Sequence, residues 1–167
     1  MKTFDMIVKG GNVVTASDIF KADIGINEGK ISEMGLDLGA DAAEIVDASG
    51  KYVFPGGIDP HTHMNMPFGG TFSSDDFKTG TIAAACGGTT TIVDFSIHAK
   101  GKSLKQTINT WREKADGKAV IDYGIHIALT ELNEEVMNEI PEVIKQGYQS
   151  FKMYMKIGRA SCRERVF

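Results

Sequence analysis

The regular alternation of strand-like and helix-like segments after residue 51 limits most strongly how this chain can fold. Such alternation is typical of a parallel sheet with helical crossovers. The G-x-G-x-x-G loop of dinucleotide-binding folds follows none of the strands, and four strands cannot close a (β/α)₈ barrel, which needs about 250 residues. We therefore predict an α/β fold, either a small open sheet or, as we favour, the first half of a TIM-type barrel. The strand-like segments are 51–63, 89–95, 120–130 and 150–155, and the helix-like segments are 73–88, 103–117 and 133–147.

Local signals set the ends of the predicted helices. Ser73 or Ser74 is expected to cap the first helix and Gly87 to end it, and Asn133 is expected to cap the third. Pro141 is expected to split that third helix into two short pieces. The second helix carries one apolar stripe, formed by Leu104, Ile108, Trp111 and Ala115.

The first 51 residues have a different character, with short strands and no helical period. We expect a hairpin around Gly10-Gly11 and a turn at 27–30. This layer is too small to bury a core of its own, and we interpret it as the N-terminal strands of a small β-sandwich. The predicted domains are therefore 1–51 and 52–156, the second being the partial barrel.

The last eleven residues, 157–167, depart from the rest of the chain. Arg112 is the only arginine in the first 156 residues, whereas "IGRASCRERVF" holds three. The peptide resembles the translation of a sequencing-adapter read, so we predict that 157–167 is a non-native tail.

Charge and composition exclude several classes of partner. The net charge of −4 gives no indication of nucleic acid or an anionic membrane as partner. No apolar run reaches the roughly 18 residues that a membrane span needs, and the N-terminus has no signal-peptide core. Two cysteines without an export signal favour a reducing compartment, so we expect a cytoplasmic protein.

Two histidines in "GGIDPHTHMNMP" indicate chemistry. Side chains two positions apart on a strand face the same way, so His61 and His63 would share one side. At the C-terminal end of a barrel strand they would line the active-site mouth. Two neutral imidazoles can bind one divalent metal ion, although an isolated H-x-H pattern also occurs in surface loops.

Lys152 interrupts the last strand, on the same face as Ser150 and Tyr154. A buried ammonium tends to lose its proton, and a neutral amine can take up CO₂ to form a carbamate. The two carbamate oxygens could bridge two metal ions, unless Lys152 is simply an edge lysine that reaches solvent. His98 and His126 each lie alone near or within a strand, where a hydrogen-bonded core role is the more frequent one.

Taken together, the motifs resemble the dihydropyrimidinase/hydantoinase family of the amidohydrolase superfamily, from about Met6 to Met155. The segments that carry the resemblance are "FPGGIDPHTHMNMPFGGTFSSDDFKTGTIAAACGGTTTIVDF", "DYGIHIALT" and "SFKMYM". The resemblance implies a (β/α)₈ barrel with a small β-sandwich. It also implies that His61, His63 and Lys152, the last as N6-carboxylysine, hold two divalent metal ions, with zinc expected and Co, Ni, Mn and Fe still open.

The same resemblance implies the reaction. A hydroxide between the two metals would open a dihydropyrimidine or 5-substituted hydantoin ring and give an N-carbamoyl amino acid. Met64 and Phe68 match a loop that lines the substrate pocket, and the complete enzyme is expected to be a homotetramer. Related enzymes that act on allantoin or dihydroorotate, and related scaffold proteins without catalysis, are the alternatives.

The chain also departs from the family pattern. Two further histidine ligands and an aspartate that acts as ligand and proton shuttle belong to later strands, which this sequence lacks. A tyrosine normally follows the bridging lysine by five positions, and here Ile157 stands at that position. We therefore expect this segment to be inactive alone.

Overall fold

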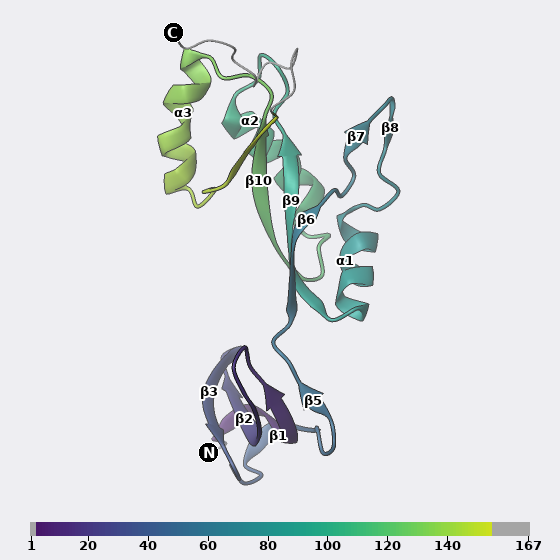
Figure 1. Ribbon diagram of the computed structural model, residues 1–167, viewed down its shortest axis with the longest axis vertical. Coiled ribbons are helices and arrows are strands. Elements are labelled where there is room, and N and C mark those ends of the chain that lie inside the picture. The colour runs from purple at the N-terminus through teal and green to yellow at the C-terminus, as the bar shows by residue number, and fades with distance from the viewer. Residues whose placement is uncertain (1–2, 155–167) are drawn as a thin grey trace. The chain divides into compact units, whose positions relative to one another are not determined.

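The chain folds into two compact units, Met1–Pro55 and Gly56–Phe167, in the computed structural model (Figure 1). The structure describes residues 3–154; the predicted tail and position 157 lie outside the described residues.

Unit 1 is a five-stranded sheet in the order β3-β2-β1-β4, with β5 also paired to β1. Val13, Ala22 and Ile24 form its small apolar core, so the expectation that this layer buries no core of its own is wrong. The turn predicted at 27–30 joins β2 to β3, and both Glu28 and Gly29 have the positive φ that a tight hairpin turn requires. The strands are β1 Phe4–Val14, β2 Ile19–Asn27, β3 Lys30–Gly35, β4 Ala42–Asp47 and β5 Tyr52–Val53.

The prediction of a hairpin at Gly10-Gly11 is wrong, because β1 runs through both glycines as one strand. The pairing with β2 shifts between Val8 and Gly11, which marks a β-bulge. Gly10 has φ +73° there, and its N–H donates to the buried carboxylate of Asp23 at 2.7 Å. The glycine pair therefore bends a continuous strand instead of reversing the chain.

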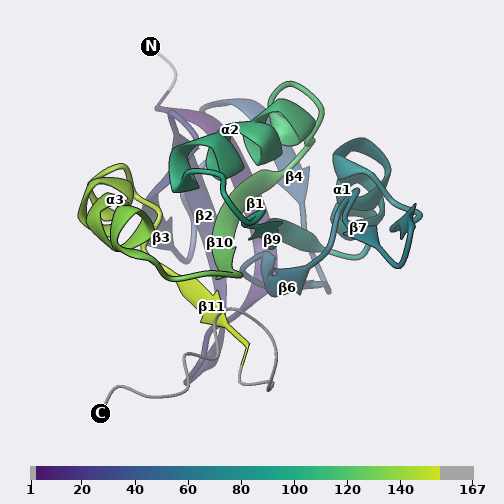
Figure 2. The ribbon, with the colours of Figure 1, turned by 90° about the horizontal axis from the view of Figure 1, so that it is seen from above.

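Unit 2 is built on a four-stranded parallel sheet in the order β11-β10-β9-β6. Strands that follow one another along the chain are neighbours in this sheet, and helices α1, α2 and α3 fan around its outer side (Figure 2). A short hairpin, β7–β8, follows β6. The bounds are β6 Gly57–Thr62, β7 Pro67–Phe68, β8 Thr71–Phe72, α1 Phe77–Cys86, β9 Thr89–Ile97, α2 Leu104–Ala115, β10 Asp122–Leu129, α3 Glu134–Lys145 and β11 Phe151–Met153.

The core of unit 2 lies between this sheet and its helices. The predicted stripe of α2 is buried along its whole length. Its residues join two apolar clusters with side chains from the outer face of β9 and β10. Burial of these side chains at roughly 25 cal/mol per Å² is the main stabilisation of the layer. The sheet residues of the clusters are Ile92, Ile125, Ile127 and Leu129.

Two details of the helices differ from the prediction. Asp76, and not Ser73 or Ser74, caps α1, because its carboxylate accepts the N–H groups of Lys78 and Thr79 at 2.8 Å each. Helix α3 runs unbroken through Pro141. The caps expected at Asn133 and Gly87 are both present.

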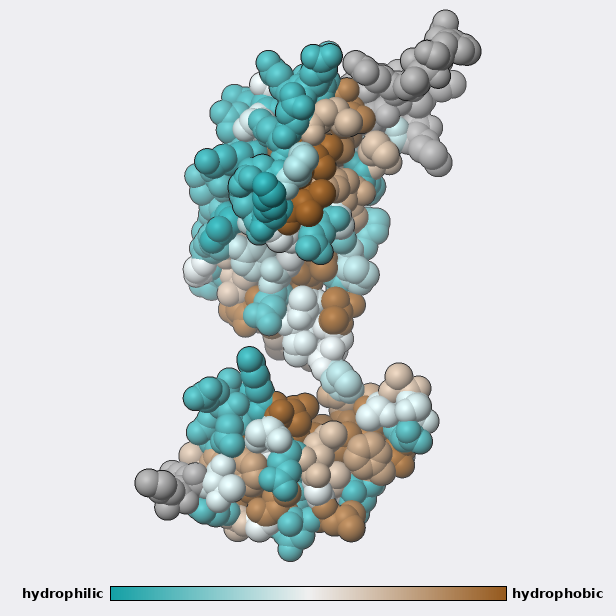
Figure 3. All heavy atoms as spheres, turned by 90° about the vertical axis from the view of Figure 1, so that its left-hand side faces the viewer, coloured by the Kyte–Doolittle hydropathy of each residue, from teal (hydrophilic) through white to brown (hydrophobic). Residues whose placement is uncertain are grey.

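Both edge strands of the sheet carry exposed apolar side chains. Ile58 on β6 is 67% exposed and Met153 on β11 is 59% exposed. On the side of the molecule where α3 lies, a hydrophobic band borders the hydrophilic surface of unit 2 (Figure 3). None of the helices among residues 3–154 is long and apolar enough to cross a membrane.

The packing predicts which apolar residues hold the layer together. Ile127→Ala removes a fully buried side chain and should lower the free energy of unfolding by about 2–5 kcal/mol. Ile82→Ala on α1 is the matched control, because Ile82 is 43% exposed, and it should cost less than about 1 kcal/mol. Urea unfolding followed by circular dichroism measures both. Equal losses in the two variants would contradict this assignment of the core.

Candidate functional site

The inner face of the sheet, opposite the helices, brings the predicted site residues together around one aromatic ring. His61 and His63 lie at the end of β6, with ring centroids 5.1 Å apart and an edge-to-face angle of 87°. The ring of Phe95, on the neighbouring strand β9, lies 4.6 Å from His61 and 5.4 Å from His63. The alternation predicted for the histidine pair is thus present.

Lys152 reaches the same ring from the opposite edge of the sheet. Its Nζ lies 4.3 Å from the centroid of Phe95, within the range of a cation–π contact. Ala128 of β10 is the register partner of Lys152, and Phe151 next to it packs in the outer apolar cluster. The amine therefore projects toward the two imidazoles and away from the helices, although two strands separate β11 from β6.

The environment of His63 favours a neutral imidazole with a free lone pair. Burial lowers the pKa of His63, and the charges of His61 and Lys152 act in the same direction, while Asp94 opposes them. The Nδ1 atom of His63 is buried and has no hydrogen-bond partner. An unpaired buried nitrogen is costly unless something binds to it. These properties fit a ligand of a divalent cation, which requires a deprotonated ring nitrogen.

Asp94, on the outer face of β9, holds the residues on both sides of His63. Its Oδ1 accepts the Thr62 hydroxyl at 3.0 Å and the Met64 N–H at 2.8 Å. Its Oδ2 accepts the indole N–H of Trp111 on α2 at 2.9 Å. The side chain is fully buried, and this burial raises the pKa of Asp94 in spite of the three donors. Asp94 thus joins the end of β6, strand β9 and helix α2.

A cavity of about 530 Å³ opens beside the predicted ligands. His63 and Lys152 line it, together with Phe68 of the β7–β8 hairpin. Tyr154 also lines it, and its ring centroid lies 5.5 Å from the amine of Lys152. The other lining residues are Met66, Pro67, Gly69 and Ile97.

Met64, the other residue expected to line the substrate pocket, lies on the opposite side of the sheet. Met64 does not line this cavity but packs in the outer cluster that contains Phe77. A Cβ atom at Gly80 of α1 would lie 2.3 Å from its sulfur. The missing side chain of Gly80 makes room for the Met64 side chain on this side of the sheet.

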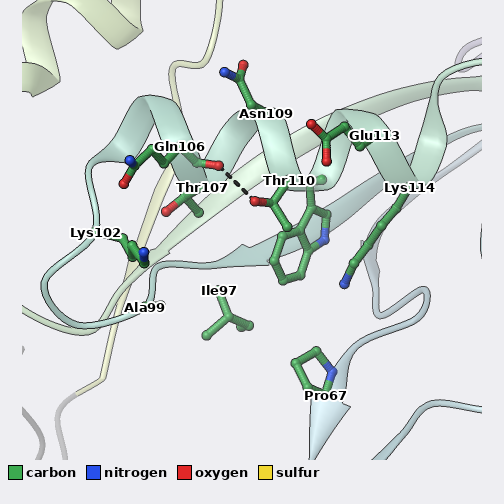
Figure 4. Close-up of a pocket in the computed structure, with 11 residues that line it drawn as sticks. Pro67, Ile97, Ala99, Lys102, Gln106, Thr107, Asn109, Thr110, Glu113 and Lys114 are labelled. Carbon is green, nitrogen blue, oxygen red and sulfur yellow. Dashed lines mark hydrogen bonds between the residues drawn. The ribbon is translucent and has the colours of Figure 1, made fainter.

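A second cavity, of about 610 Å³, runs along α2 (Figure 4). It shares Pro67 and Ile97 with the first cavity, and Lys114 extends toward it from the helix. Lys114 donates to the Asn65 carbonyl at 2.9 Å and lies 4.2 Å from the Trp111 ring. Lys114 thus stabilises the loop after His63.

His98 and His126 both make hydrogen bonds within the fold. The Nε2 atom of His98 lies 2.6 Å from the Lys102 carbonyl oxygen, beside the loop that leads to α2. His126 contacts Pro60 and Ser150. Sequence reasoning missed Asp94 and Phe95. A carboxylate inside the β-branched run "TTTIVDF" was the available signal, because a buried charge requires several donors.

Comparison with known proteins identifies a family and several similar proteins. The model of the amidohydrolase family matches residues 52–160. The chain is 56% identical over 150 residues to D-hydantoinase of Geobacillus stearothermophilus, a match that covers 89% of this chain and 32% of the relative. Among solved structures, the crystal structure of dihydropyrimidinase from Brevibacillus agri is similar to this chain, with a TM-score of 0.88 and 52% sequence identity. The match covers 92% of this chain and 33% of that one. Atrazine chlorohydrolase from Arthrobacter aurescens, in a crystal structure complexed with zinc, is a distant fold relative. Its sequence identity is 16% and its TM-score 0.59, and the match covers 89% of this chain and 45% of that one.

The fold of unit 2 is a mixed α/β fold whose curled parallel sheet is consistent with part of a barrel. The chain belongs to the amidohydrolase family. It spans about a third of the length of the D-hydantoinase and dihydropyrimidinase relatives that it matches.

Replacement of the buried carboxylate of Asp94 should lower the stability of the fold. In Asp94→Asn, an amide N–H₂ that replaces Oδ2 would face the indole N–H of Trp111, so two donors would oppose each other. We expect a loss of about 1–3 kcal/mol in the free energy of unfolding. Trp111→Phe removes one of the two donors, so the double variant should be less destabilised than the sum of the single variants. Asp122→Asn, at an exposed position on β10, is the control; strictly additive losses would contradict the proposed pairing.

Proposed function

We propose that the full-length protein hydrolyses a cyclic amide bond in a dihydropyrimidine or 5-substituted hydantoin and releases an N-carbamoyl amino acid. The observation that carries this proposal is the gathering of His61, His63 and Lys152 around Phe95, from the two opposite edges of the sheet. Membership of the amidohydrolase family and the names of the similar proteins point to the same chemistry.

The residues of the inner face fit a centre of two divalent cations. His61 and His63 would each supply an imidazole nitrogen, and His63 has the lowered pKa and the unpaired Nδ1 atom that suit this role. Among residues 3–154, no group of three or more His, Cys, Asp or Glu side chains is placed to hold a metal ion. Lys152 is the candidate for a third ligand from this segment.

Lys152 would become a ligand by reaction with CO₂. An unprotonated lysine amine forms an N–C bond to CO₂ and releases a proton, and the resulting carbamate would offer two oxygens as ligands for the cations. Zinc suits imidazole and carboxylate ligands, and Co, Ni, Mn and Fe are alternatives. When bound, such cations acidify a water molecule and polarise a carbonyl group. The zinc complex of a distant fold relative is compatible with this choice.

The cavity beside the cluster suits a small cyclic ureide. Phe68 and Pro67 of the β7–β8 hairpin would contact the apolar substituent of the ring, while His63 and Lys152 lie at the polar end. A pocket with an apolar wall and few polar groups is the usual form of a small-molecule site. We expect Phe68, which is 72% exposed, to contribute to the preference for the 5-substituent.

The rest of the protein follows from the same proposal. Strands β6, β9, β10 and β11 would be the first four strands of a (β/α)₈ barrel, and unit 1 would be part of a β-sandwich. The sequential parallel order and the exposed apolar side chains on both edge strands support this view. We expect the segment alone to be inactive and the full-length protein to be a cytoplasmic homotetramer.

Substitution of the ligands tests the metal centre. In the full-length protein, His61→Ala and Lys152→Ala should each lower bound zinc well below the wild-type amount and reduce turnover by at least about a thousandfold, because each removes a ligand. Metal content is measured by inductively coupled plasma mass spectrometry. Lys105→Ala, at an exposed position on α2, is the control and should change neither quantity. Wild-type turnover in Lys152→Ala would exclude the bridging role.

Substrate comparison tests the reaction. We expect hydrolysis of dihydrouracil and of 5-substituted hydantoins, abolished by a chelator and restored by zinc. Ring opening is measured by the loss of ultraviolet absorbance and by detection of the N-carbamoyl product. Preference for allantoin or dihydroorotate would favour a related cyclic amidohydrolase. Bound metal and turnover both absent from the full-length protein would favour a scaffold protein.

A further inference from the structure

The end of β6 that carries His61 is not held by ordinary sheet pairing. The register with β9 passes from Asp59 opposite Ile92 to Thr62 opposite Asp94, so β6 has one residue more than its partner. Pro60 and His61 lie in this bulge, where ladder hydrogen bonds are interrupted. A bulge at this point leaves the position of His61 to other contacts.

Side chains satisfy the backbone of the bulge. The N–H of His61 donates to the carboxylate of Asp59 at 3.0 Å. The carbonyl oxygen of Pro60 lies 3.0 Å from Nε2 of His126, which projects from β10. The residue directly before His61 is therefore held by a side chain from a strand that does not pair with β6.

The same imidazole also contacts the segment that leads into β11. Its Nδ1 atom is hydrogen-bonded to the hydroxyl of Ser150, two residues before Lys152. The backbone carbonyl of Ser150 accepts the N–H of Ile127, which fixes the start of β11 on β10. The side chain of His126 thus connects edge strand β6 with the residue before edge strand β11. Each contact lies close to a predicted ligand.

The hydrogen-bond partners determine which ring nitrogen of neutral His126 carries the hydrogen. A carbonyl oxygen can only accept, so Nε2 carries the hydrogen and donates to Pro60. Nδ1 then accepts the hydroxyl hydrogen of Ser150. The ring also packs 4.8 Å from Phe95, the aromatic residue that His61, His63 and Lys152 surround. Both ring nitrogens and the ring face are therefore used.

We infer that His126 is a positioning residue that sets the distance between the histidine pair on β6 and Lys152 on β11. This inference rests on the proposed function, in which those residues bind the two cations. A metal centre tolerates displacements of only a few tenths of an ångström in its ligands, and loss of a supporting contact typically weakens metal binding by about 10–100-fold. His126 would act through Pro60 and Ser150 without touching the metal.

Four substitutions in the full-length protein separate the contacts of His126. His126→Phe keeps a ring against Phe95 and removes both hydrogen bonds. His126→Gln can keep a donor near the position of Nε2, and His126→Asn can keep an acceptor near that of Nδ1. Ser150→Ala removes the bond to β11 alone. His98→Gln is the control for replacing a histidine, because His98 bonds to the Lys102 carbonyl and contacts neither Pro60 nor Ser150.

The measurements are the rate at which zinc is lost to a colorimetric chelator and the thermal midpoint of the metal-free protein. We expect zinc loss about 10–100-fold faster in His126→Phe and an intermediate rate in His126→Gln. Ser150→Ala should accelerate zinc loss in the otherwise wild-type protein. In a double variant with His126→Phe, it should not increase the rate of zinc loss any further. His98→Gln should lose zinc within about twofold of the wild-type rate, whatever its thermal midpoint, because it lies outside the bridge.

The outcomes distinguish this inference from the proposed function. If His61→Ala abolishes zinc binding but His126→Phe and His126→Gln lose zinc at the wild-type rate, the positioning role is wrong and the metal centre stands. If the rates simply follow the thermal midpoints across all variants, with His98→Gln included, His126 is a structural residue only. If His61→Ala retains its zinc, the proposed centre itself fails.

Discussion

The buried carboxylate of Asp94 is the interaction on which the arrangement of the site depends. It accepts hydrogen bonds from Thr62 and Met64, on either side of His63, and from Trp111 on α2. A charge in this position costs free energy, and three donors offset that cost only if all three stay in place. The end of β6 and the helix that covers the sheet therefore have to be correctly placed together.

Strand alternation separates this supporting layer from the chemistry. On β6 and β9, Thr62 and Asp94 face the helices, whereas His61, His63 and Phe95 face the other side. On β10 and β11, Ile127 and Phe151 pack in the outer cluster, whereas His126 and Lys152 reach Phe95. A one-residue shift in any of these strands would exchange the two sets of side chains. The pattern thus links correct folding directly to the formation of the cluster.

Local sequence signals predicted the order of elements and the faces of the strands, because period and turn residues act over a few positions. The stripe of α2, the cap at Asn133 and the shared face of Ser150, Lys152 and Tyr154 are examples. Pro141 misled the prediction: proline removes one backbone hydrogen bond of a helix, but α3 continues through it, and Met137, four residues earlier, is half exposed.

The contacts that support the site were harder to predict, because they join residues far apart in the chain. His126 meets Pro60 from 66 positions away, and Asp94 meets Thr62 from 32. No periodic pattern marks such pairs in a single sequence. The destination of Met64 was hidden for the same reason, since it depends on a glycine in the next helix.

That glycine has a chemical consequence for the loop after His63. The sulfur of Met64 occupies the space that a side chain at position 80 would fill, so no further atom fits between the sulfur and Gly80. Oxidation of a methionine adds one oxygen to the sulfur and makes it polar. In a protein exposed to peroxide, the oxidised side chain of Met64 would have to move away from α1. Because Met64 directly follows His63 in the chain, this movement would also displace the imidazole of His63.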